Sequence, residues 1–384
     1  MKILYLIIVL IFAVNTLYTS EFGAGEKKGR ISDKKLGEIS GIVAGRTNPG
    51  IFWIHNDSGD EPRIFAIGED AGLIGELAVT GAAHYDFEDI GIGPGPGAGA
   101  NHIYIGDIGD NDAVRKFITV YRIAEPSIDT MGQKPFGNSS VPAESLYLEY
   151  PDGARDAEAM FVDPANGDIY IVTKRELKVR VYRAEYPQAI NDTTVLEYLL
   201  ELPFGSMGIP GNGVTGADIS TDGREILIKT YSAVYYFSRE NGESIEDALA
   251  KTPKTLKYTI EPQGEGICWA ADGKGFYTLS EFGSASESIF YFYSRLSNAV
   301  KKNDESKEIR VYESDGELII GKTNDEVEIV SVSIYDICGR LAEFYGISSD
   351  EFIINKKHLG TGTFVIVIEQ AGNNFQYYVL RNFI

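Results

Sequence analysis

One strand–turn–strand pattern recurs along this chain and constrains its fold more than any other feature. The clearest copy runs from Asp86 to Asn111: a polar start leads into an apolar strand, a Gly/Pro turn and an alternating strand that ends in an acidic loop. A further strand rich in aromatic or β-branched residues follows each copy. Five copies at intervals of roughly 45–70 residues are typical of a propeller-type array, in which one unit cannot bury its own apolar face. The copies begin at Glu38, Asp86, Asp156, Thr215 and Gln263.

Aligning the copies on their turns produces two polar columns, one in each strand of the pattern. The start of one antiparallel strand and the end of the next lie at the same edge of a hairpin. The innermost strand of a propeller blade lines the central channel. We therefore expect both columns at one mouth of that channel, and we place the functional site there. The first column is Ser40, Glu88, Glu158, Thr215 and Glu265, and the second is Asn56, Asp107, Thr173, Thr230 and Ser280.

The N-terminal residues are typical of a secretory signal peptide. One lysine precedes an apolar segment from Ile3 to Val14, which is too short to span a bilayer, and small polar residues follow. We assign residues 1–22 to the signal, with cleavage between about Thr19 and Ala24. An uncleaved membrane anchor is the alternative. After cleavage we expect no transmembrane span.

The composition argues against several classes of partner and site. A formal net charge of -21 opposes the approach of nucleic acid or of an anionic membrane surface. The two cysteines, Cys268 and Cys338, exclude a disulfide framework, and neither has the spacing of a metal site or a nucleophile. We expect Cys268, inside a predicted inner strand, to be a small buried hydrophobe. We expect the protein to be a monomer.

The predicted fold is all-β, with a propeller over residues 28–297. The run from Gly29 to Leu36 could supply the outer strand of the last unit and so close the ring. We predict five blades, or six if the two long units contain further strands. Those units include residues 133–142 and 203–212, which we interpret as surface loops because they are rich in Gly, Pro and Asn. Residues 298–307 form a charged linker, and residues 308–384 contain enough short strand patterns for a small C-terminal β-sandwich.

This C-terminal region resembles a known family of export domains. The segment SVSIYDICGRLAE, followed by IINKKHLGTGTFVIVIE and a final strand, is similar to the Por-type sorting domain of type IX secretion. The terminal RNFI departs from the family, which usually has more lysine there. The resemblance implies that the type IX machinery recognises residues 308–384 and carries the protein across the outer membrane, for secretion or cell-surface attachment. The matching residues are Tyr335, Asp336, Gly339, Arg340, Leu359, Gly362 and Phe364.

The repeat domain also resembles known proteins. The motifs EISGI, HNDSGD, DFEDI, IGDIGDN and TGADIS are together similar to a group of secreted bacterial β-propellers of unassigned activity. More distantly, the domain is similar to phytase-like and esterase-like propellers. The resemblance implies a fold and an export route, and it transfers no catalytic residue.

The two polar columns suggest a metal site. Glu88, Glu158 and Glu265, with Asp107 nearby, offer the hard oxygen donors that calcium prefers. A metal there could polarise a phosphoryl or carbonyl oxygen and activate water. The alternative is that the columns line a water-filled channel. The candidate ligand-binding residues around the mouth are Asn56, Asp57, Arg63, Arg115, Lys174 and Lys229.

Two functional hypotheses follow, and they differ in whether the site at the channel mouth is catalytic. His55 is a candidate general base, but no G-x-S-x-G nucleophile motif accompanies it, which favours a structural role. The first hypothesis is a binding module that recognises a small ligand or surface polymer at the acidic mouth. The second is a calcium-dependent hydrolase of a phosphoester, ester or lactone.

Overall fold

The computed structural model divides by its contacts into two compact units, Met1–Leu296 and Ser297–Ile384. Apart from the short helices η1 (Lys34–Leu36) and α1 (Ile245–Leu249), the described secondary structure is β-strand. No helix in the described part of the chain is long and apolar enough to cross a membrane. The predicted linker and all but the last two residues of the predicted signal peptide lie outside the described residues. The structure describes residues 21–97, 99–128, 139–190, 192–204, 213–296, 309–314, 317–322, 328–336, 341–346, 351–355, 362–370 and 374–382.

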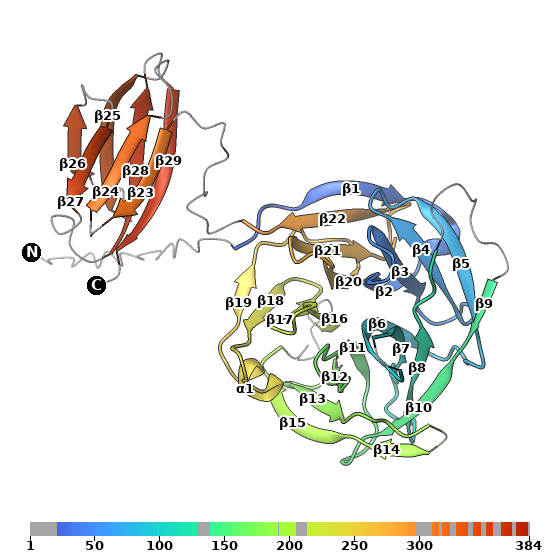
Figure 1. Ribbon diagram of the computed structural model, residues 1–384. Coiled ribbons are helices and arrows are strands. Elements are labelled where there is room, and N and C mark those ends of the chain that lie inside the picture. The colour runs from blue at the N-terminus through green and yellow to red at the C-terminus, as the bar shows by residue number, and fades with distance from the viewer. Residues whose placement is uncertain are drawn as a thin grey trace, which may run out of the picture. The chain divides into compact units, whose positions relative to one another are not determined.

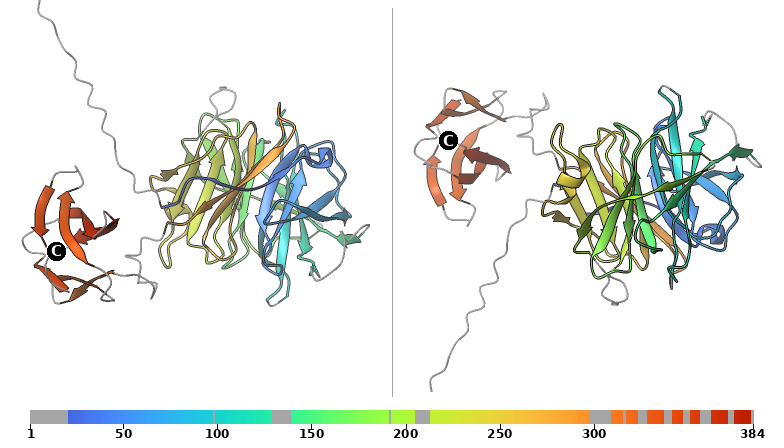
Figure 2. Two further views of the ribbon diagram at one scale, coloured as in Figure 1. Left: turned by 90° about the horizontal axis from the view of Figure 1, so that it is seen from above. Right: turned by 90° about the horizontal axis from the view of Figure 1, so that it is seen from below.

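Five sheets surround one axis in the first unit, an arrangement like that of a β-propeller (Figure 1). Figure 2 shows the same sheets from the side. The innermost strands contact one another in a closed circle, in the order β2, β6, β11, β16, β20 and back to β2. The first sheet contains β2 (Ile39–Ala44), β3 (Ile51–Asn56), β4 (Arg63–Gly68), β5 (Leu73–Thr80) and β9 (Ser139–Pro142), and the second β6 (Phe87–Pro94), β7 (Asn101–Asp107), β8 (Ile118–Ala124), β10 (Glu144–Glu149) and β14 (Thr193–Val195). The third contains β11 (Ala157–Val162), β12 (Ile169–Thr173), β13 (Val179–Ala184) and β15 (Glu197–Leu202), the fourth β16 (Val214–Ile219), β17 (Glu225–Thr230), β18 (Val234–Ser238) and β19 (Lys254–Leu256), and the fifth β20 (Gly264–Trp269), β21 (Gly275–Ser280), β22 (Ser288–Ser294) and β1 (Glu26–Ile31).

The two ends of the first unit meet in the fifth sheet. Strand β1 pairs antiparallel with β22, so the N-terminal segment supplies the outer strand of the last sheet, as the sequence predicted. The strand starts at Glu26, before the predicted Gly29. Phe22, which precedes it, is fully buried and packs edge-on against Phe276 at 5.1 Å between ring centroids. The first and last parts of this unit are therefore held in one sheet.

The two long repeats contain further strands, one of them within a predicted loop. The predicted loop at residues 133–142 is wrong over Ser139–Pro142, which forms β9 and pairs parallel with β5. Strand β14 likewise pairs parallel with β10. Both strands cover the outer edge of an existing sheet, where unpaired backbone groups would otherwise be left. Residues 133–138 and 205–212, which belong to the predicted loops, lie outside the described residues.

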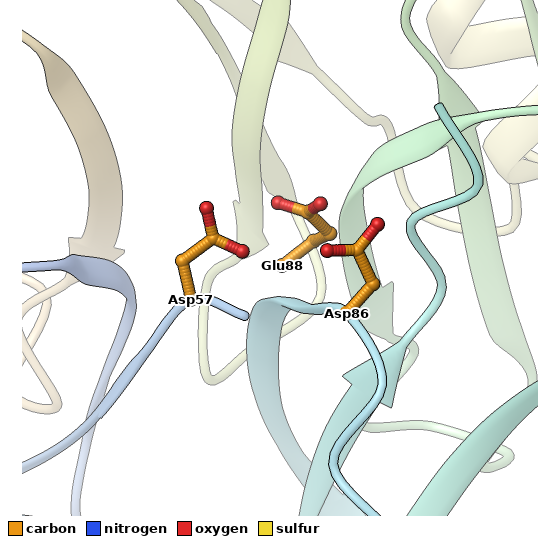
Figure 3. Close-up of side chains that lie close together, drawn as sticks. All are labelled: Asp57, Asp86 and Glu88. Carbon is orange, nitrogen blue, oxygen red and sulfur yellow. The ribbon is translucent and has the colours of Figure 1, made fainter. Parts of the chain in front are cut away.

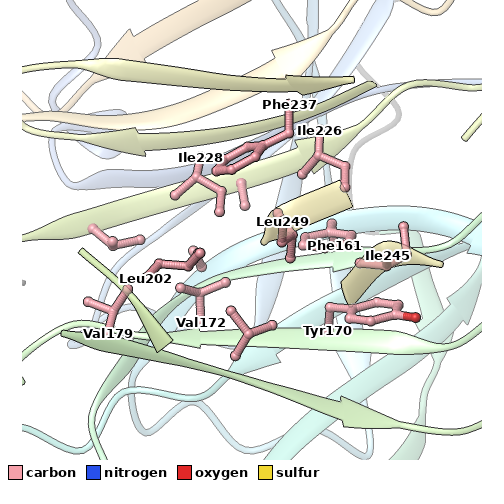
Figure 4. Packing of buried hydrophobic residues seen from close by; sticks show 14 of the residues in the cluster. Phe161, Tyr170, Val172, Val179, Leu202, Ile226, Ile228, Phe237, Ile245 and Leu249 are labelled. Atoms are coloured by element: carbon pink, nitrogen blue, oxygen red, sulfur yellow. The ribbon is translucent and has the colours of Figure 1, made fainter. Parts of the chain in front are cut away.

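Alternate residues of neighbouring sheets form the cores of the first unit. Figure 4 shows the core between the third and fourth sheets, where Phe161, Tyr170 and Ile228 are among the buried residues. Burying a side chain of this kind stabilises the fold by about 1.5–3 kcal/mol relative to leaving it exposed. Cys268 lies in a similar core with no exposed surface, which confirms its prediction as a buried hydrophobe.

The second unit contains two sheets around one core. Buried residues from both sheets, such as Ile320 and Ile366, belong to the same cluster. Within the motif that resembles a sorting domain, Tyr335 pairs with Val365 across two central strands. Gly339, Arg340, Leu359 and Cys338 lie outside the described residues. One sheet contains β23 (Ile309–Ser314), β24 (Glu317–Lys322) and β27 (Glu351–Asn355), and the other β26 (Leu341–Gly346), β25 (Ile329–Asp336), β28 (Gly362–Gln370) and β29 (Asn374–Asn382).

Candidate functional site

Each of the five innermost strands carries a β-bulge at the same place, its second residue. In the first sheet, for example, the pairing passes from Ile39 to Gly41 and leaves Ser40 out. A bulge re-aims the side chain of the extra residue and is often found next to active sites. The five bulged residues are the first polar column, Ser40, Glu88, Glu158, Thr215 and Glu265.

The second polar column lies directly opposite the start of these strands. Asn56 pairs with Ile39 and Asp107 pairs with Phe87, and the other three sheets repeat this register. All ten column residues are at most 6% exposed. The register therefore brings two layers of buried polar groups to one end of the ring.

The second sheet departs from its neighbours at this end. In the other four sheets, the residue after the second column donates its backbone N–H to the carbonyl of the residue two positions before the first-column residue, as Asp57 does to Glu38 at 2.7 Å. In the second sheet, Gly109 makes this bond to Asp86 at 3.3 Å, one residue later than in the others. The extra residue, Ile108, is fully buried. Local backbone irregularity thus occurs where the carboxylates gather.

Asp57, Asp86 and Glu88 form the group of carboxylates at this mouth that could hold a metal. One oxygen from each lies within 4.8 Å of the others, and Figure 3 shows the three side chains facing a common space. A Cβ atom at Gly109 would lie 2.4 Å from Asp86 Oδ2 and from Glu88 Oε1. Because only glycine leaves room for both carboxylates, Gly109 allows them to converge. This oxygen-only donor set fits a hard cation such as calcium.

The electrostatics of this cluster favour a counter-cation. Burial, followed by the charges of Glu158, Asp57 and Asp86, raises the pKa of Glu88 well above its ordinary value. Burial, together with the charges of Asp57 and Asp156, raises the pKa of Asp86 to about 6. Burial also raises the pKa of Asp57. Like charges in a desolvated site disfavour ionisation, so a bound cation would relieve the repulsion and return these groups to their ionised forms.

Glu158 and Glu265, which were also predicted as metal ligands, form contacts outside this cluster. Glu158 Oε1 forms an ion pair with Lys174 Nζ at 2.6 Å, and Lys174 donates to the Tyr231 hydroxyl at 3.2 Å. That hydroxyl donates to Glu265 Oε1 at 2.8 Å, while Glu265 Oε2 has no hydrogen-bond partner among the described residues. Burial would lower the pKa of Lys174, but the charges of Glu158 and Glu265 outweigh it and raise that pKa. A polar chain therefore runs across three sheets beside the acidic cluster.

Asp107 and the predicted cations are mostly held by ion pairs. Arg115 Nη1 donates to Asp107 Oδ1 at 2.8 Å and to the Gly109 carbonyl at 2.7 Å, which fixes the loop around the cluster. Arg63 is paired with Asp60. Lys229 has no exposed surface, and its ammonium donates to the Gly264 carbonyl. The structure therefore buries Lys229 away from the solvent that would carry a ligand.

Two further predicted residues have mainly structural contacts. Asn56 donates through Nδ2 to the Lys35 carbonyl and to Asp60 Oδ2, each at 2.7 Å. His55 is fully buried, with Nδ1 at 2.9 Å from the Asn56 carbonyl oxygen. Burial lowers the pKa of His55 to about 4, so the ring is neutral near pH 7. A neutral histidine without solvent access is poorly placed to act as a general base.

Asp86 belongs to the cluster but was not among the site residues predicted from the sequence. It precedes the first-column residue Glu88 by two positions, and Asp156 stands in the same relation to Glu158. The signal was therefore present in the alignment at the position two residues before the first column. Asp57, predicted as a ligand-binding residue, occurs here beside Asp86 and Glu88.

The comparisons with known proteins leave the site to be argued from its geometry. No protein-family model matches the chain, and no curated protein matches it. Among solved structures, the chain is similar to PorZ, a bacterial surface component of the type IX secretion system of Porphyromonas gingivalis, with 13% identity and a TM-score of 0.31. The match covers 88% of this chain and 51% of that one, so the chain spans about half the length of PorZ. A luciferin-regenerating enzyme is similar over 70% of this chain and 95% of its own, with 11% identity and a TM-score of 0.38. Similarity at this level supports no argument about activity.

Proposed function

We propose that the first unit is a five-bladed β-propeller that binds calcium through Asp57, Asp86 and Glu88 and uses it to hold a ligand at the channel mouth. The observation that carries this proposal is the approach of three carboxylates from two sheets to within 4.8 Å. Calcium takes about six to eight oxygen ligands, so three carboxylates leave positions for oxygens of a small ligand or surface polymer. The proposed function is therefore to bind a ligand whose oxygens coordinate the same calcium ion as the three carboxylates.

An export route forms the second part of the proposal. The N-terminal residues act as a signal peptide, and residues 308–384 form a β-sandwich sorting domain that the type IX machinery recognises. The motif residues quoted above support this, as does the separate core of the second unit. A chain that lacks residues 297–384 should remain in the periplasm. Immunoblotting of culture fluid, outer membrane and periplasm tests this, and normal export of the shortened chain would contradict it.

A calcium-dependent hydrolase of a phosphoester, ester or lactone is the second candidate. The observation that favours it is the Glu158–Lys174 pair beside the cluster. Burial raises the pKa of Glu158 despite the opposing charge of Lys174, a property of many groups that transfer protons. Turnover of a substrate panel that requires both calcium and Glu158 would favour the hydrolase. Binding without turnover would favour the binding module.

Calorimetric titration of calcium into metal-free protein tests the proposed cation site. We expect one calcium ion to bind per chain and to raise the melting temperature, since the unfolded chain has no preformed site. Asp86→Asn and Glu88→Gln each remove one ligand charge and should weaken binding at least about tenfold, roughly the effect of 1.4 kcal/mol. Glu158→Gln should weaken it less, because Glu158 lies outside the cluster of three.

Asp112→Asn is the matched control for Asp86→Asn. Asp112 is exposed and lies in the loop that follows Gly109. Its substitution should leave calcium affinity unchanged, which separates loss of a ligand from a general loss of negative charge. Equal melting temperatures of the wild-type protein in calcium and in chelator would contradict the calcium site. The polar columns would then line a water-filled channel. An effect of Glu158→Gln larger than that of Glu88→Gln would instead favour the ligand set predicted from sequence.

A further inference from the structure

A groove on the second sheet, beside the acidic cluster, has no part in the proposed calcium site. It has a volume of about 510 Å³ and is lined by the segment before β6, the loop between β7 and β8, and strands β8 and β10. Small-molecule sites commonly have volumes of about 300–1,000 Å³. The groove is therefore large enough for one or two rings of a ligand.

Aromatic rings form much of the groove wall and remain open to solvent. Tyr85 is 71% exposed and Phe117 is 40% exposed, although burial of such rings would normally be favourable. Phe117 packs edge-on against Tyr147, with ring centroids 5.1 Å apart, so a side chain of β10 supports this ring. Exposed aromatic rings grouped in a concavity mark a contact surface for a flat, partly apolar ring.

The groove also has a charge opposite to that of the chain. None of its ten lining residues is acidic, in a protein with 56 aspartate and glutamate residues. Arg115 and Lys116 lie in the lining, and Asp107 offsets the charge of Arg115 through their ion pair. Lys116 is exposed and has no hydrogen bond or ion pair with any residue that the structure describes. Its free ammonium makes the groove suitable for an anion.

Hydroxyl groups provide the third chemical feature of the lining. Thr119, Ser145 and three tyrosines contribute them, and the Tyr121 hydroxyl accepts the Ala83 N–H at 3.0 Å. From these features we infer that the groove binds an acidic sugar. The aromatic rings stack on the apolar face of the sugar, the hydroxyls hydrogen-bond to its hydroxyls, and Lys116 pairs with its carboxylate. This binding does not depend on the calcium cluster.

Calorimetric titration of the full mature chain with tetragalacturonate, in the presence of EDTA, tests the inference. EDTA keeps the mouth free of metal, so failure of the calcium proposal leaves this result intact. We expect saturable binding of one oligosaccharide per chain, with neutral maltotetraose bound at least about tenfold more weakly because it lacks the carboxylates. Tyr85→Ala should weaken the binding about tenfold through the loss of stacking, and Lys116→Gln should weaken it about threefold.

Tyr198→Ala and Lys178→Gln are matched controls. Tyr198 is 44% exposed on the third sheet, and the Lys178 side chain is 61% exposed. Both variants should bind tetragalacturonate like the wild type, and unchanged melting temperatures would show that all four variants fold. The inference is overturned by absence of saturable binding, by equal affinity for maltotetraose, or by wild-type affinity in the Tyr85 and Lys116 variants. Tighter binding of adenosine monophosphate would overturn the sugar assignment in favour of an aromatic anion.

Discussion

Buried carboxylates at Asp89 and Asp218 connect the innermost strands of different sheets at the centre of the ring. Asp89 Oδ2 accepts the backbone N–H of Met160 at 2.8 Å and that of Ala217 at 3.0 Å, which belong to the third and fourth sheets. Asp218 Oδ2 accepts the N–H of Trp269, in the fifth sheet, at 2.7 Å. An innermost strand has no further strand on its channel side, so its N–H groups need other acceptors. These two side chains supply them.

Asp218 should make the stability of the first unit depend on pH. Burial raises the pKa of Asp218 to about 7, although the Trp269 N–H and the charge of Arg46 lower it. The folded form then holds a proton that the unfolded form releases above its own pKa of about 4. Stability from this group is complete below pH 4 and is lost as the pH rises towards 7, by at most about 1.4 kcal/mol per pH unit.

Asp218→Asn should remove that part of the pH dependence. The amide resembles the protonated acid, so the variant should gain free energy of unfolding relative to the wild type as the pH rises from 4 to 7. Urea unfolding across this range measures the difference, and Asp112→Asn, at an exposed position, should show the wild-type slope. Parallel curves for the wild type and Asp218→Asn would contradict the raised pKa.

At the scale of single residues, the sequence predicted the layer in which the carboxylates lie, but it did not predict which of them contact one another. Turn signals and strand alternation place Glu88, Glu158 and Glu265 in one layer. A bulge interrupts alternation at each of these residues, so the pattern no longer indicates the direction of the side chain. Lys174 then pairs with Glu158, whereas Glu88 turns to Asp57 and Asp86. Only the folded backbone decides between these arrangements.

At the scale of elements, the N-terminal segment is a structural part of the fifth sheet. Phe22 packs against Trp269 and Phe276, and Glu21 forms an ion pair with Lys254 of the fourth sheet. Under the proposed export route, these contacts predict cleavage before Glu21, at the early end of the interval predicted from sequence. The ring closure was predictable because the last repeat lacked a fourth strand. Strand β9 was missed because its Ser- and Pro-containing segment is stabilised by the edge of β5 rather than by its own sequence.

Phe22→Ala should therefore destabilise the first unit strongly. Phe22 is fully buried among aromatic rings of the fourth and fifth sheets, and truncating such a side chain costs about 3–5 kcal/mol because a cavity remains. Urea unfolding of the mature protein measures this loss. Ile260→Ala is the control, since Ile260 is 71% exposed and its loss should change stability by less than about 0.5 kcal/mol. A similar small effect for Phe22→Ala would show that the segment before β1 is dispensable.

At the scale of the whole molecule, each buried hydrophobic cluster belongs to one unit. Five clusters lie within the first unit and one lies within the second, among the residues that the structure describes. In the sequence, the repeated pattern gives way to short unrelated strand patterns near residue 297, and the domain boundary is predicted there. Repeat units bury their faces against one another, so the end of a repeat is expected to mark the end of a core.

Separate cores predict separate unfolding. A mature chain that ends at Leu296 should fold, and it should melt where the first unit melts in the full chain, because its clusters lose no member. Calorimetric scans of both chains test this. Added calcium should raise the melting temperature of the same transition in both chains, since Asp57, Asp86 and Glu88 all lie in the first unit. A fall of more than about 3 °C, roughly 1 kcal/mol for a unit of this size, would mean that the second unit stabilises the first. A calcium shift in the full chain alone would place the bound ion outside the acidic cluster.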